Sequence, residues 1–142
     1  MKTLWQLHPQ LAADSCGVGD FPLSRLLLMN DAQYPWCILV PRIAGARELH
    51  RLDDADQLQL LRESTALSRG MEAVFAPHKM NVAALGNVVP QLHIHHVARY
   101  RGDPAWPAPV WGKYPPQAYA ADLLEQRLLK LHGVLPGLQP LD

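Results

Sequence analysis

One stretch of this sequence decides how the chain is interpreted: Gln91-Leu92-His93-Ile94-His95-His96-Val97-Ala98-Arg99. In an extended backbone, successive side chains point to opposite faces. Gln91, His93 and His95 then share one face, and the aliphatic residues between them enter a core on the other. This alternation predicts a half-buried strand that presents imidazoles. His96 has the parity of the apolar set, so we expect it in a structural or rim position, where the strand leaves the core.

The size and charge of the chain limit the classes to which it can belong. Its 142 residues, 49% of them hydrophobic, suffice for one core. We expect a single domain over residues 1–142, with its main part at about 20–100 and an arm and helix at about 101–135. Thirteen basic and thirteen acidic residues cancel, which argues against a nucleic-acid or anionic-membrane partner. A small anionic ligand stays compatible, because one pocket can be basic within a neutral protein.

The cysteines and the N-terminus indicate a compartment. Cys16 and Cys37 show neither a framework nor a CxxC spacing, which suits a reducing environment. Residues 1–9 lack the apolar segment of a signal peptide, and no later run approaches the length that spans a bilayer. We therefore expect a soluble cytoplasmic protein.

The first half of the chain predicts a short helix and a hairpin. Pro9 suits the first turn of a helix, and the two glycines of residues 16–20 indicate the turn that ends it. Residues 23–29 and 36–40 are apolar runs typical of strands. The polar residues 30–35 between them predict an antiparallel pair.

The next segment predicts a helix and two further strands. Asp53 is a good N-cap for an amphipathic helix that Pro77 ends. Residues 80–84 indicate a strand, residues 86–87 a tight turn, and residues 88–97 the strand that carries the histidines.

After Arg99 the composition changes. Residues 103–112 hold too many prolines for regular structure, and their two tryptophans predict an extended arm that packs onto a surface. Pro116 suits the start of a last helix, and Gly133 its C-terminal cap. The fold class is therefore α+β, with about five antiparallel strands and helices on one face.

The order of these elements and the histidine motif resemble the histidine-triad (HIT) family of nucleotide hydrolases and transferases. The family signature is His-φ-His-φ-His-φ-φ, where φ is apolar, often followed by a basic residue. His93 and His95 match the second and third histidines, and Arg99 matches the basic residue. Gln91 stands in the first histidine slot, and His96 stands where an aliphatic residue is usual. The proline-tryptophan arm is similar to that of a bacterial branch of HIT-like proteins.

The resemblance implies a HIT-like fold, a homodimer, and a purine nucleotide derivative as substrate, with no cofactor and no metal. Further substrate contacts are expected at Asn30, Asp31, Asn81, Gly86, Asn87, Val88 and Arg99. For the loop around Gly86 the reason is physical as well, because a glycine turn exposes main-chain N–H groups that can bind an anion.

The mechanism implied by the resemblance is covalent. His93 attacks the α-phosphorus of a dinucleoside polyphosphate or a nucleoside phosphoramidate, and water resolves the nucleotidyl-enzyme. Its other ring nitrogen should donate to a fixed acceptor, the carbonyl of the first triad position, which Gln91 supplies as well as histidine would. His95 is expected to contact phosphate oxygens or to protonate the leaving group. Replacing the first histidine by Gln91 removes one imidazole from the leaving-group side.

Several alternatives stay open from the sequence. The protein is a nucleotidyltransferase if the acceptor is not water, or a nucleotide-binding module if the altered first slot abolishes turnover. A metal-dependent hydrolase would need a third ligand, and His50, His78, His132 and Cys37 offer no clear one. Asn30 and Asp31 are also common turn formers, and Arg99 can simply pair with a carboxylate.

Overall fold

The computed structural model describes residues 4–141 and contains one five-stranded antiparallel sheet with the strand order β1-β2-β3-β5-β4. In chain order the elements are α1 (Pro9–Asp14), β1 (Ser15–Asp20), β2 (Ser24–Met29), β3 (Trp36–Pro41), the 3-10 helix η1 (Leu49–Arg51), α2 (Asp54–Phe75), β4 (Lys79–Ala83), β5 (Ile94–Arg99) and α3 (Ala121–Val134). The predicted α+β class, with about five antiparallel strands, is confirmed. None of the helices in the described part of the chain is long and apolar enough to cross a membrane.

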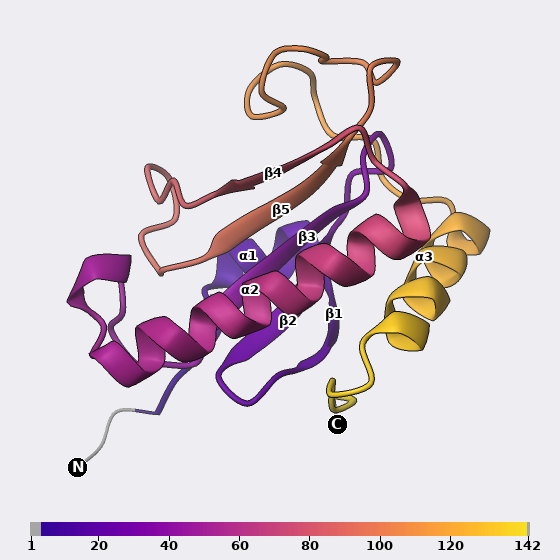
Figure 1. The fold of residues 1–142 in the computed structure, drawn as a ribbon. Helices are drawn as coiled ribbons and strands as arrows, with labels where there is room; N and C mark the ends of the chain where they lie inside the picture. The colour runs from indigo at the N-terminus through magenta and orange to yellow at the C-terminus, as the bar shows by residue number, and fades with distance from the viewer. Residues whose placement is uncertain (1–3, 142) are drawn as a thin grey trace.

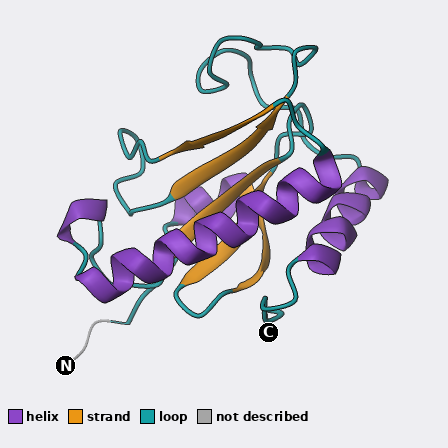
Figure 2. Ribbon diagram, in the orientation of Figure 1, coloured by secondary structure: helices purple, strands orange, loops and turns teal. Residues whose placement is uncertain are grey.

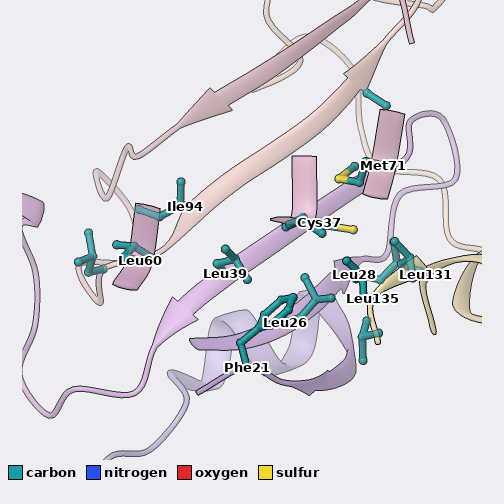
Figure 3. Close-up of a cluster of buried hydrophobic side chains, with 14 of the residues drawn as sticks. Phe21, Leu26, Leu28, Cys37, Leu39, Leu60, Met71, Ile94, Leu131 and Leu135 are labelled. Atoms are coloured by element: carbon teal, nitrogen blue, oxygen red, sulfur yellow. The ribbon is translucent and has the colours of Figure 1, made fainter. Parts of the chain in front are cut away.

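Each face of the sheet is covered by a different part of the chain. Helix α2 crosses one face and packs against α3, while α1 lies behind the sheet (Figure 1). The core under α2 and α3 is built from leucines and other apolar side chains, which Figure 3 shows. The opposite face carries a second cluster, to which α1 contributes Leu11 and the arm contributes Val110. Figure 2 draws that arm, between β5 and α3, as loop throughout.

Helix α2 begins and ends where the sequence predicts. Asp53 caps it by accepting the main-chain N–H of Asp56 at 3.0 Å. The helix stops at Ala76, which adopts a left-handed backbone with φ 45°, and Pro77 follows. Leu60, Leu67 and Met71 are buried against the sheet, among other residues of the helix. The predicted N-cap and core-facing stripe are confirmed.

The expected turn at residues 16–20 is wrong, because this segment is β1. A methyl group on Gly19 would lie 2.6 Å from the carbonyl oxygen of Gln139, and one on Gly17 would lie within 2.5 Å of the Leu141 side chain. The glycines therefore mark the close approach of the C-terminal segment to β1, not a chain reversal.

The segment before β5 also differs from the prediction. Strand β5 begins at Ile94 instead of residue 88, and residues 84–93 form a longer connection instead of a two-residue turn at 86–87. Pro90 has no N–H for a ladder bond, and this interrupts the pairing of the stretch as a strand.

The last helix begins at Ala121 and not at Pro116, because residues 115–119 are bonded in an extended form to the loop after β2. Gly133 lies inside α3, whose C-cap is Leu135, so the predicted glycine cap is wrong. The arm does pack onto a surface as predicted, with Trp106 against His78 and Trp111 against Trp36.

Candidate active site

His93 and His95 lie side by side on the sheet face opposite α2. Their ring centroids are 4.8 Å apart, and the two residues are 6% and 5% exposed. His93 is the last residue before β5, and His95 is the second residue of that strand. Ile94 between them points into the core under α2 (Figure 3). The predicted alternation across this stretch is confirmed, but the expected half-burial is wrong, because β5 is buried along its whole length.

The orientation of the His93 ring is fixed by the main chain. Its Nδ1 lies 2.7 Å from the carbonyl oxygen of Gln91. A carbonyl only accepts hydrogen bonds, so Nδ1 carries the proton and the lone pair lies on Nε2. The hydrogen bond expected from the first triad position is therefore present, and Nε2 is the nitrogen that can attack an electrophile.

The orientation of the His95 ring is fixed by a tryptophan. Trp36 donates its indole Nε1–H to Nδ1 of His95 at 3.0 Å. Indole nitrogen is only a donor, so Nδ1 is unprotonated and the proton of the neutral ring lies on Nε2. Burial, followed by the nearby His93 and His96, lowers the pKa of His95 to about 3. At neutral pH the ring is an uncharged donor at Nε2.

Two tryptophans complete the wall around His95, and neither was predicted as a site residue. Trp111 from the arm lies edge-on to both rings, with its centroid 5.3 Å from that of His95 and 6.0 Å from that of Trp36. Trp36 opens β3, where the sequence indicated only a strand residue. The tryptophan content of the arm was the one available signal for Trp111.

The side chain of Gln91 binds the N-terminal segment. Its Oε1 accepts the main-chain N–H of His8 at 2.8 Å, and its Nε2 donates to the carbonyl oxygen of Gln6 at 2.8 Å. Both ends of the amide are therefore engaged. Gln91 contributes to the site through its carbonyl, and its side chain fastens residues 6–8 beside the histidine pair.

Of the structural and rim positions expected for His96, this residue occupies the structural one. It is fully buried on the α2 face, with Nε2 2.7 Å from the Ser64 hydroxyl and Nδ1 3.0 Å from the carbonyl of Ile94. Burial lowers its pKa to about 4. The predicted parity is right, but the strand continues through this residue, which links β5 to α2.

Arg99 and Asn81 form a structural network in this fold. Arg99 is 1% exposed and donates to both carboxylate oxygens of Asp103, at 2.8 and 3.1 Å. It also donates to Oδ1 of Asn81 and to the carbonyl of Ala108. With these acceptors around it, the guanidinium anchors the arm to β4 and β5 instead of facing a ligand, as the carboxylate-pairing alternative suggested.

Asn30 and Asp31 act as loop-fastening residues. Oδ1 of Asp31 accepts the main-chain N–H groups of Gln33 and Gln117, and Oδ1 of Asn30 accepts that of Tyr119. The turn-forming alternative accounts for these contacts. The structure does not bring either side chain into contact with His93 or His95.

The loop at residues 86–88 lies just upstream of Gln91. Gly86 has a positive φ of 77°, and the Val88 side chain is exposed. In the described part of the chain, the main-chain N–H groups of these three residues donate to no main-chain acceptor. They are therefore available to an anion, and this loop stays a candidate for phosphate binding.

A metal centre has no donor set in residues 4–141. No group of three or more His, Cys, Asp or Glu side chains there could hold an ion. The pair of imidazoles thus lacks the third protein ligand that a zinc site needs.

Comparison with known proteins gives a consistent result. Residues 10–102 match the family model described as HIT domain. A histidine triad protein from Marinobacter aquaeolei VT8 is 53% identical over 96% of this chain and 99% of its own, with a TM-score of 0.93. One from Bradyrhizobium japonicum is 44% identical over 94% and 99%, with a TM-score of 0.92. One from Sinorhizobium meliloti 1021 is 35% identical over 92% and 97%, with a TM-score of 0.90. No curated protein matches the chain.

Proposed function

The chain belongs to the HIT domain family, and from this membership and the geometry around His93 we propose that it is a nucleotide hydrolase. The substrate is a purine nucleotide derivative, either a dinucleoside polyphosphate or a nucleoside phosphoramidate. The reaction takes place at the α-phosphorus and passes through a nucleotidyl-His93 intermediate.

The hydrogen bond between His93 and Gln91 is the observation that carries this proposal. It leaves the lone pair of Nε2 free. The ring is held in place by its attachment to the main chain and by the hydrogen bond at Nδ1. A nucleophile oriented in this way loses little freedom on attack. The first triad position needs only its carbonyl for this purpose, so glutamine in that slot is compatible with turnover.

The neighbouring groups suit the charge of the reaction. The neutral His95 ring lies beside His93 with its proton on Nε2, from which it donates to a phosphate oxygen. The main-chain N–H groups of residues 86–88 supply further donors for the anion. Both contributions stabilise negative charge without requiring a change in protonation.

Rapid-quench intact-mass spectrometry tests the proposal. Wild type and His93→Ala are mixed with diadenosine tetraphosphate and with adenosine phosphoramidate, and the mass of the protein is followed. We expect a nucleotidyl adduct in wild type and none in His93→Ala, and an adduct in His132→Ala, whose histidine is exposed on α3. Nucleotide binding without adduct or product would contradict the proposal and favour a binding module. Decay of the adduct only after a phosphorylated acceptor is added would favour a transferase.

We also propose that the protein is a homodimer. Strand β4 is an edge strand, and the groove between it and α2 is lined mostly by apolar side chains, together with Asp54, Gln57 and Ser64. Leu61 is 63% exposed and Val82 is 50% exposed on the two sides of this groove. An open edge beside an apolar groove fits a second copy of the same surface. Sedimentation velocity should give a dimer for wild type and Leu129→Asp and a monomer for Leu61→Asp. A wild-type monomer would contradict it.

A further inference from the structure

We propose that Trp36 is a positioning residue that keeps His95 as a hydrogen-bond donor and withholds it as a proton donor. The site therefore favours nucleotide derivatives whose leaving group departs as an anion. This inference rests on the proposed covalent reaction at His93 and chooses between the two substrate classes named there. It assigns the dinucleoside polyphosphate, which is a phosphoanhydride, as the good substrate and the nucleoside phosphoramidate as the poor substrate.

The hydrogen bond from Trp36 to His95 opposes protonation of the His95 ring. A protonated His95 would carry hydrogens on both ring nitrogens, and its Nδ1–H would then face the Nε1–H of Trp36 at 3.0 Å. Two donors at that distance repel each other, so protonation would break the contact. Burial acts in the same direction, because the ring has little access to water that could solvate a charge.

The other imidazoles near the pair do not replace His95 as an acid. His8 is attached to the Gln91 side chain through its main chain, and its Nδ1 is engaged with the main-chain N–H of Gln10 at 3.0 Å. His96 lies on the other face of the sheet, against Ser64. Gln91 has no acidic proton. In the part of the chain that the structure describes, neither His8 nor His96 is hydrogen-bonded to His93 or His95.

The chemistry of the leaving group then decides the substrate. In the first half-reaction the Nε2 lone pair of His93 forms a bond to the α-phosphorus, and the bond to the leaving group breaks with its electron pair. In a phosphoanhydride this pair goes to a phosphate oxygen, which is stable as an anion and needs no proton. In a phosphoramidate it goes to a nitrogen, which departs only if an acid protonates it.

The second half-reaction needs no acid either. After the first step the His93 ring is a cation, because Nδ1 keeps its proton toward the carbonyl of Gln91. Water attacks the phosphorus, the P–N bond returns its electron pair to Nε2, and the proton of the water passes to solvent. The ring is neutral again, with its proton on Nδ1, as at the start.

Two aryl esters of adenosine 5′-phosphate test the inference directly. The 4-nitrophenyl and phenyl esters have the same nucleotide and nearly the same shape, but 4-nitrophenolate is much the weaker base. A positioned general acid would raise the rate of departure of the more basic phenolate by about 10²–10⁴-fold. For the wild type we therefore expect kcat/KM to be at least about 100-fold higher for the nitrophenyl ester. We also expect diadenosine tetraphosphate to be cleaved faster than adenosine phosphoramidate.

Trp36→Phe removes the indole donor and keeps an aromatic ring. A proton on Nδ1 of His95 then no longer faces the N–H of Trp36 and is opposed only by burial and the neighbouring histidines. At pH 6 we expect the rate ratio between the two esters to fall about tenfold in this variant. Trp106→Phe is the matched control, because Trp106 lies in the arm and packs against His78 instead of His95. Its ratio should stay at the wild-type value.

The nitrogen NMR shifts of His95 give a second readout that needs no variant. In wild type at pH 6 they should report an unprotonated Nδ1 and a protonated Nε2. Equal rates for the two esters in wild type, an unchanged ratio in folded Trp36→Phe, or a protonated Nδ1 would each overturn the inference. Failure of the proposed function differs from all three, since neither ester would then form an adduct with His93.

Discussion

The Nδ1 atom of His93 lies 2.7 Å from the main-chain carbonyl oxygen of Gln91, two residues earlier in the chain. The contact closes a short local ring and depends on the backbone at position 91, not on the side chain found there. The amide of Gln91 points elsewhere and holds the main chain of Gln6 and His8. One residue therefore has two separable roles, one toward the ring of His93 and one toward the N-terminal segment.

Replacing Gln91 by alanine should separate these roles. We expect Gln91→Ala to keep the nucleotidyl adduct on His93, because the carbonyl remains. The loss of two hydrogen bonds should lower the free energy of unfolding by about 1–2 kcal/mol. Urea denaturation measures the second effect, and hydrogen exchange should rise in residues 4–14. Gln126→Ala, exposed on α3, is the control. Loss of the adduct in folded Gln91→Ala would show that the side chain itself takes part in the reaction.

The role of Arg99 can be decided by separating binding from stability. Removing the guanidinium leaves the buried carboxylate of Asp103 unpaired, which costs about 3–5 kcal/mol. We expect Arg99→Lys to lower the free energy of unfolding by much of this amount. The reason is that an ammonium cannot pair with both oxygens of Asp103 and also reach Asn81. The KM for the nucleotide should change much less than the midpoint of urea denaturation. A raised KM at unchanged stability would instead support the substrate contact expected from the family motif.

Local patterns predicted most of the elements correctly. The alternation around His93 gave the face of each side chain, and the cap at Asp53 gave the start of α2, because both depend on neighbours in the chain. The hydrogen bond of His93 could also be expected, since it joins residues two apart.

Contacts between distant segments were not predictable from such patterns. The bonds of Gln91 to the N-terminal segment span 83 and 85 residues, and Trp36 meets His95 across 59. No periodicity encodes which residues such contacts join. Gly19 shows the same limit, because a glycine that allows close approach of another segment is indistinguishable in sequence from one that forms a turn.

Gly19 itself gives a direct test of that explanation. A methyl group in Gly19→Ala would lie 2.6 Å from both the carbonyl oxygen of Gln139 and Cγ of Leu138, so the C-terminal segment must move away from β1. We expect a loss of about 1–3 kcal/mol in the free energy of unfolding, measured by urea denaturation. Gly102→Ala meets no atom within 4 Å and should change stability little. Equal stability of the two variants would contradict the packing explanation.

The stability of the protein should depend on pH through its two buried neutral histidines. The pKa of His95 is lowered to about 3 and that of His96 to about 4, both from the ordinary value of 6.5 and both chiefly by burial. Below pH 6.5 the unfolded chain therefore binds more protons than the folded one. The free energy of unfolding therefore has its full value above pH 6.5. It decreases as the pH falls from 6.5 toward the folded-state pKa values of the two histidines. Between pH 7.5 and pH 5 each histidine should account for a loss of about 2 kcal/mol.

Thermal or urea unfolding at several pH values measures this loss of stability. A double variant at His96 and Ser64 shows how much of the loss is due to His96. Replacing His96 by leucine together with Ser64→Ala removes the titrating ring and its hydroxyl partner at once, so no buried polar group is left unpaired. We expect the loss between pH 7.5 and pH 5 to shrink by about 2 kcal/mol in this double variant and to stay unchanged in His132→Ala. His95 then accounts for most of what remains, because its ring also stays neutral in the fold over this range. A wild-type stability that is flat from pH 7.5 to pH 5 would mean that the folded protein admits a proton on these rings, and Trp36 would then not hold His95 in its neutral form.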